Sequence, residues 1–63
     1  MISVTRFNDT KIVINADIIQ SVEETPDTVI TLTTGTKYIV KESSSDIVDR
    51  VIEYKRKIYT NLN

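Results

Sequence analysis

Cysteine and histidine are absent from this 63-residue sequence, and glycine and proline each occur once. Without cysteine no disulfide can form, and without both residue types the usual ligands of a structural zinc ion are missing. Ser-His-Asp and Cys-His catalysis are excluded for the same reason, and a single glycine cannot build a Gly-rich phosphate-binding loop. We therefore predict no catalytic residues, no metal site and no cofactor, and we do not expect an enzyme.

Long hydrophobic runs are also absent. No apolar segment approaches the ~20 residues that cross a membrane, and residues 1–6 lack the apolar core of a signal peptide. We expect a cytoplasmic protein with no transmembrane segment. A chain of 63 residues makes a single domain, residues 1–63, and a domain this small buries only about 60% of its unfolded surface. Its stability must come from an efficient core or from oligomerisation, since disulfides are excluded.

Short segments that are rich in β-branched residues and bounded by turn residues predict an antiparallel sheet of four or five strands. The predicted strands are residues 2–6, 11–14, 18–24, 28–33 and 37–40. Residues 18–24 are ambiguous, because their apolar residues also fit the spacing of a short helix capped by Asn15. We favour a strand there, since the segment ends at Thr25-Pro26 and isolated helices this short are weak.

Three turns are predicted from residues with special backbone preferences. Asn8-Asp9 supply the first turn, because both residues tolerate the left-handed conformation. Pro26-Asp27 suit the central positions of a type I turn, where proline pre-sets φ. Thr34-Gly35 predict a tight hairpin turn in which Gly35 adopts a positive φ.

The C-terminal third of the chain predicts a helix over residues 44–59, which makes the fold class α+β. Ser43 is the predicted N-cap, with Asp46 three residues later. Favourably oriented i, i+4 ion pairs are expected for Asp46 with Arg50 and for Glu53 with Lys57. One stripe at helical spacing contains Ile47, Val48, Val51, Ile52, Lys55, Ile58 and Tyr59.

Several predicted strands carry apolar residues on both faces. Val13 opposes its neighbours on the second strand, Val29 does so on the fourth, and Ile39 does so on the last. One helix covers only one face of a sheet, so the second apolar set needs a barrel interior or a partner subunit. We therefore predict a homo-oligomer.

The candidate contact residues for a partner are basic. Lys55 and Arg56 belong to a cluster at the end of the predicted helix, and this cluster suits an acidic protein patch, RNA or an anionic lipid surface. The alternative is a solvated helix end favoured by the helix dipole. A second basic surface is expected only if the strands bring together Arg6, Lys11, Lys37 and Lys41. The net charge of −1 makes nucleic acid an unlikely partner.

The order of these segments resembles the FlbD/SwrD family of small flagellar proteins. The resemblance rests on Ile2-Ser3-Val4-Thr5-Arg6-Phe7-Asn8, on Asn15-Ala16-Asp17, on residues 25–32, on Tyr38-Ile39-Val40-Lys41-Glu42-Ser43 and on residues 51–58. Thr36 and the triplet Ser43-Ser44-Ser45 depart from the family pattern. The resemblance covers nearly the whole chain and carries no catalytic residue onto it.

The resemblance implies a cytoplasmic bacterial protein of the flagellar system that is linked to swarming and to motor power through the stator units. We expect a non-enzymatic accessory or adaptor protein that binds a protein partner, with the stator or another motor component as the candidate, at the inner face of the membrane near the motor. The alternative is a small dimeric RNA-binding regulator similar to the carbon storage regulator type, which also runs from an apolar strand and Thr-Arg into one C-terminal helix.

Overall fold

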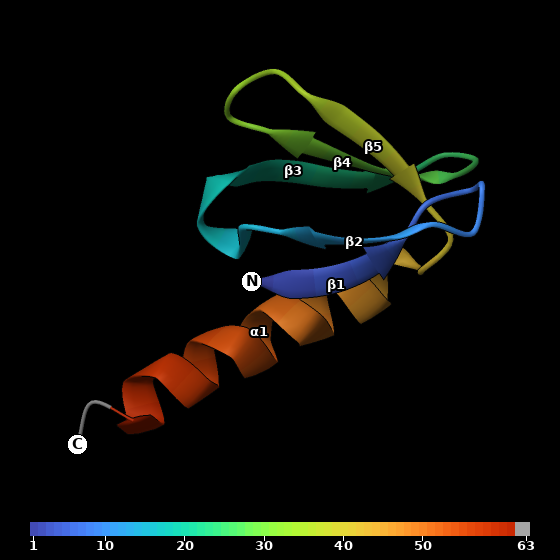
Figure 1. Ribbon diagram of the computed structural model, residues 1–63. Helices are drawn as coiled ribbons and strands as arrows, with labels where there is room; N and C mark the ends of the chain where they lie inside the picture. The colour runs from blue at the N-terminus through green and yellow to red at the C-terminus, as the bar shows by residue number, and fades with distance from the viewer. Residues whose placement is uncertain (62–63) are drawn as a thin grey trace.

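The computed structural model describes residues 1–61, which form two small antiparallel sheets and one C-terminal helix (Figure 1). The elements are β1 (Ile2–Thr5), β2 (Lys11–Ile14), the 3₁₀ turn η1 (Ala16–Ile18), β3 (Ile19–Glu24), β4 (Thr28–Leu32), β5 (Lys37–Val40) and α1 (Ser44–Asn61). Strands β1 and β2 pair in the first sheet, and β3, β4 and β5 pair in that order in the second. The predicted α+β class is confirmed.

The β1–β2 loop is a three-residue hairpin connection. The Asp9 N–H donates to the Arg6 carbonyl at 2.9 Å, and the Arg6 N–H donates to the Thr10 carbonyl at 2.9 Å. Asp9 has φ 65, so it adopts the left-handed conformation that closes such a loop. Asn8 supports the turn by accepting a bond from the Thr10 N–H at 3.1 Å, which confirms the turn predicted from Asn8-Asp9.

The β4–β5 loop repeats the same geometry with glycine at the left-handed position. The Gly35 N–H donates to the Leu32 carbonyl at 2.9 Å, and the Leu32 N–H donates to the Thr36 carbonyl at 2.8 Å. Gly35 has φ 92, and a Cβ placed there would meet no atom within 4 Å. The backbone conformation, and not lack of space, therefore favours glycine at this position.

The two sheets join at a narrow seam. Arg6 and Val40 form an isolated antiparallel bridge, and the Lys41 N–H donates to the Thr5 carbonyl at 2.8 Å. The seam brings the β1–β2 loop beside the last residues of β5 (Figure 1).

Residues 15–24 contain a single 3₁₀ turn followed by a strand. Asn15 caps the turn by accepting a bond from the Asp17 N–H at 3.0 Å, and β3 then runs from Ile19 to Glu24 against β4. The strand favoured by the sequence is confirmed, and the capping role of Asn15 extends over one turn only.

The segment between β3 and β4 is a short bend around Pro26. The Thr25-Pro26 peptide bond is cis. The Thr25 N–H donates to the Asp27 carbonyl at 3.3 Å in this bend. The break predicted at Pro26-Asp27 is confirmed, because β3 ends at Glu24 and β4 begins at Thr28.

The core lies between the two sheets and the start of α1. Its buried residues are Ile2, Val4, Ile14, Ala16, Ile30, Leu32, Val40 and Ile47. On β1, β2, β4 and β5 the buried residues lie at alternate positions, so the residues between them face outward. Val13 is 65% exposed and Ile39 is 48% exposed, while Val29 is half-buried. The second apolar set is therefore divided between the outer faces of two sheets and does not form one continuous face.

The start of α1 is fixed by side chains from elsewhere in the chain. Ser43 is the N-cap, as predicted, because its hydroxyl accepts a bond from the Asp46 N–H at 3.2 Å. The Ser44 N–H donates to the Glu24 carboxylate at 2.6 Å, so the end of β3 holds the first turn of the helix. This bond keeps the pKa of Glu24 below its usual value.

Arg50 does not make the ion pair predicted with Asp46. Its guanidinium donates to the Ser3 carbonyl and lies 3.3 Å from the Glu42 carboxylate. Glu42 also accepts a bond from the Thr5 N–H at 2.9 Å, and its side chain is only 11% exposed. Burial raises the pKa of Glu42, but the Thr5 N–H and the charge of Arg50 outweigh burial and leave the pKa lowered. Arg50 pairs with Glu42 and not with Asp46, because the bond from the Thr5 N–H holds the Glu42 carboxylate close to the guanidinium.

The last part of α1 extends beyond the sheets (Figure 1). The molecule is therefore 40 Å long but only 22 by 19 Å across. Glu53 and Lys57 form the predicted ion pair at 3.6 Å between two exposed side chains. The helix ends at Asn61 and so is slightly longer than predicted, while the predicted stripe position Tyr59 has a side chain outside the described part of the structure.

Candidate functional site

The structure brings two of the predicted contact residues together. Arg6 follows β1 and Lys37 begins β5, and both line a shallow hollow of about 340 Å³. The other residues of this hollow are Phe7, Asn8, Tyr38 and Ile39. We call these six residues the basic corner. It forms because the seam between Arg6 and Val40 places the β1–β2 loop against β5.

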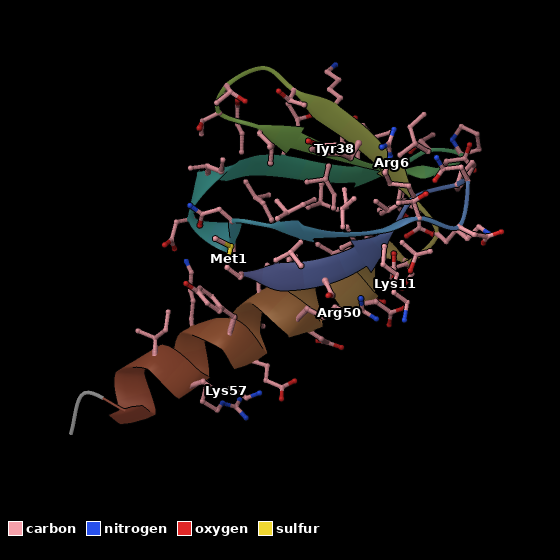
Figure 2. The ribbon with its side chains drawn as sticks, in the orientation of Figure 1. Met1, Arg6, Lys11, Tyr38, Arg50 and Lys57 are labelled. Atoms are coloured by element: carbon pink, nitrogen blue, oxygen red, sulfur yellow. The ribbon has the colours of Figure 1, made fainter. Side chains whose placement is uncertain are left out.

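The basic corner combines exposed apolar surface with positive charge. Phe7 is 51% exposed, Ile39 is 48% exposed, and the Arg6 guanidinium lies 6.0 Å from the centre of the Tyr38 ring (Figure 2). That distance is at the outer limit of a cation–π contact, so the ring positions the guanidinium and leaves its donors available. An aromatic side chain, an aliphatic one and a nearby guanidinium are typical of the centre of a protein-binding surface.

Lys41 lies beside the basic corner, but its charge is engaged. Its ammonium group pairs with the Asp9 carboxylate of the β1–β2 loop. Both side chains are exposed, so this pair contributes little to stability. Its main effect is to cancel one positive charge next to the corner, which leaves Arg6 and Lys37 as the cations of this surface.

Lys55 and Arg56 belong to a separate surface. Both are exposed on the second half of α1, whose neighbouring Lys57 lies on the projecting part of the helix, far from Arg6 and Tyr38 (Figure 2). The five predicted contact residues therefore divide between two surfaces and do not form one site. The basic cluster also lies before the last turn of α1, because the helix continues to Asn61.

The predictions from single residues missed Phe7 as a candidate. A phenylalanine in a short hairpin loop is the signal that points to it, because a large apolar side chain that is half exposed offers surface to a partner. The outward parity of Ile39 was recognised in the sequence, but its position beside Phe7 depends on the contact between the two sheets.

Residues 1–61 show no arrangement suited to metal binding. No group of three or more potential metal-ligating side chains occurs among the described residues. The two carboxylates with lowered pKa values, Glu24 and Glu42, hold the helix start and the β1 end and lie outside the basic corner. Their shifts therefore have a structural cause.

The comparison with protein families identifies the relationship. A family model described as FlbD, flagellar and swarming motility proteins, matches residues 1–59. The chain belongs to the FlbD family. No curated protein and no solved structure matches it. The resemblance predicted from the ordered segments of the sequence is confirmed, and a role related to flagellar and swarming motility follows from it. In the described part of this FlbD protein, no helix is both long enough and apolar enough to span a bilayer.

Proposed function

We propose that this FlbD family protein is a non-enzymatic accessory of flagellar motility that supports swarming and motor power by binding a protein partner through the basic corner. The candidate partner is the cytoplasmic part of a stator unit or another motor component, which places the protein in the cytoplasm at the inner face of the membrane. Family membership over residues 1–59 supports the motility role.

The observation that carries the binding site is the exposure of Phe7 and Ile39 between Arg6 and Lys37. Such a surface suits a partner segment that offers an apolar side chain flanked by carboxylates. The two free cations of the corner are too few for tight binding of a nucleic acid, whose affinity depends on neutralising many phosphates. The corner therefore supports a protein partner over the RNA-binding alternative.

A complementation experiment tests the proposal. A strain that lacks the gene receives the wild-type gene, a Lys37→Glu variant or a matched Lys11→Glu variant, and swarming rate, flagellar number and motor torque are scored. Both lysines are exposed and begin a strand, but only Lys37 lines the basic corner. We expect Lys37→Glu to lower swarming and torque at normal flagellar number, and Lys11→Glu to restore both.

Two outcomes would contradict the proposal in different ways. Normal swarming and torque in the deletion strain would exclude the motility role in this organism. Full complementation by Lys37→Glu and by a second variant, Arg6→Glu, would retain motility but exclude the basic corner as the binding surface. Immunoblots of each strain establish that the variant proteins accumulate to the same level.

A further inference from the structure

The flank of α1 next to β3 carries apolar residues that are open to solvent. Val48 and Ile52 are each 49% exposed, and Lys55 continues their row. These positions follow one another at spacings of four and three residues, which is the spacing of a seam between two packed helices. The flank therefore has the pattern of a helix–helix contact although the described chain supplies no second helix.

A groove lies between this flank and β3. It has a volume of about 360 Å³, and its walls include Val48, Val51 and Ile52 from α1 and Ile19 and Val22 from β3. We call it the helix groove. Its apolar walls suit an apolar side chain that is carried by a second helix lying along the flank.

Ile58 is an apolar side chain that the sheets do not cover completely. It lies eleven residues after Ile47, close to the same face of the helix, but the sheets do not extend that far along α1 (Figure 1). Ile47 is fully buried, whereas Ile58 remains 38% exposed.

The charge of α1 changes sign along its length. Residues 44–53 contain three acidic side chains and one basic one, and residues 54–61 contain three basic side chains and no acidic one. Two such helices attract each other when they run antiparallel, because the acidic half of each then meets the basic half of the other. A parallel alignment would place like charges together.

We propose that the helix groove binds α1 of a second copy of this chain, with the two helices antiparallel about a two-fold axis. Ile58 of each copy then reaches the groove of the other copy. Asp49 and Arg56 lie seven residues apart on the outer border of the flank, so Asp49 meets the partner's Arg56, and the contact occurs twice by symmetry. The basic corner plays no part in this contact, so the pairing is independent of the proposed motor partner.

Measurement of the molar mass over a concentration series provides the first test. We expect wild-type protein to change from 7.2 kDa to twice that mass as its concentration rises. Ile52→Glu would place an unpaired charge in the contact and raise the dissociation constant by more than about tenfold. Val13→Glu is the matched control, because Val13 is also an exposed apolar residue but lies on β2. We expect the dissociation constant of the Val13→Glu dimer to equal that of the wild type.

Charge reversal provides a second test that does not depend on the apolar contact. Asp49→Arg alone and Arg56→Asp alone are each expected to weaken self-association, because each leaves like charges facing each other. An equal mixture of the two variants is expected to form a heterodimer. Arg56 of the first variant then meets Asp49 of the second as in the wild type, and the two substituted positions form the other contact with reversed sign.

Three results would overturn the pairing. These are a 7.2 kDa monomer at every concentration up to the millimolar range, an Ile52→Glu variant that dimerises like wild type, and a mixture of charge-reversed variants that stays monomeric. A wild-type monomer that sediments with anionic phospholipid vesicles would assign the basic half of α1 to a membrane surface in place of a second copy. Circular dichroism of each variant establishes that the fold is intact.

Discussion

The two halves of α1 differ in what holds them in place. In the first half Ile47 is fully buried, Ser43 caps the helix, and Arg50 bonds to β1 and to Glu42. In the second half Tyr54 is half-buried against the core, the ion pair between Glu53 and Lys57 joins two exposed side chains, and the end of the helix extends beyond the sheets. Tertiary packing therefore stabilises the first half, and the second half depends on its own helix propensity and on whatever it binds.

The difference separates residues that maintain the fold from residues that are free to bind. A substitution of a buried residue of α1, such as Ile47, changes the stability of the whole domain, because it removes contacts between the helix and the sheets. A substitution of an exposed residue leaves those contacts in place and acts on association. Variants of similar chemistry in the two halves distinguish these effects.

The largest expected effect is that of truncating the buried isoleucine. Ile47→Ala removes a fully buried side chain and is expected to lower the free energy of unfolding by about 2–5 kcal/mol. Ile58→Ala makes the same chemical change on the projecting part of α1 and is expected to cost less than about 1 kcal/mol in the monomer. Urea unfolding followed by circular dichroism measures both. Equal losses would show that the two halves are held equally.

A smaller effect is expected at the carboxylate that joins the helix to β1. Glu42→Gln weakens the bonds to Thr5 and Arg50, and we expect a loss of about 1–2 kcal/mol at pH 7. The folded pKa of Glu42 lies below its unfolded value, so its contribution is complete above the unfolded pKa and is lost as the pH falls through the folded pKa. The difference between wild type and Glu42→Gln is therefore expected to decrease in acid.

Unfolding curves for both proteins between pH 7 and pH 3 measure this decrease. Glu53→Gln, which alters an exposed pair on the second half of α1, serves as the control and is expected to change stability little at any pH. A constant difference between wild type and Glu42→Gln over the whole range would contradict the role given to the Glu42 carboxylate.

The smallest expected effect concerns the first turn of α1. Glu24→Gln weakens the bond from the Ser44 N–H, and we expect a small decrease in the melting temperature at pH 7. Glu23→Gln provides the matched control, because Glu23 is the adjacent residue on β3 and points to the opposite face of the sheet. Thermal unfolding of the two variants under identical conditions makes the comparison. Indistinguishable melting temperatures would show that the Glu24 carboxylate does not stabilise the first turn of α1.

Local chemistry explains why much of the fold could be predicted. Gly35 determines its hairpin loop through its own φ, and Ser43 starts the helix through a bond to a residue three positions away. Signals of this range are readable in a single sequence. The turn at Asp9 could be predicted for the same reason, because aspartate tolerates the left-handed conformation.

Contacts between distant residues explain what could not be predicted. Glu42 and Thr5 are 37 positions apart, and their bond fixes the carboxylate that draws Arg50 away from Asp46. The basic corner likewise depends on a contact between two sheets, so Arg6 and Lys37 were recognised separately but their position beside Phe7 was not. Spacing along the chain carries no information about such pairs.

The backbone contact between the two sheets lies at the seam of Arg6 and Val40, so the shared core of buried side chains contributes most of what holds the sheets together. The Lys41 amide bonds at this seam, and it is expected to exchange with solvent faster than the Ile30 amide of the central strand β4. Opening of the seam would divide the basic corner, since Phe7 follows β1 and Ile39 belongs to β5. A partner that contacts both therefore binds the closed form alone, and its binding free energy adds to the stability of the junction.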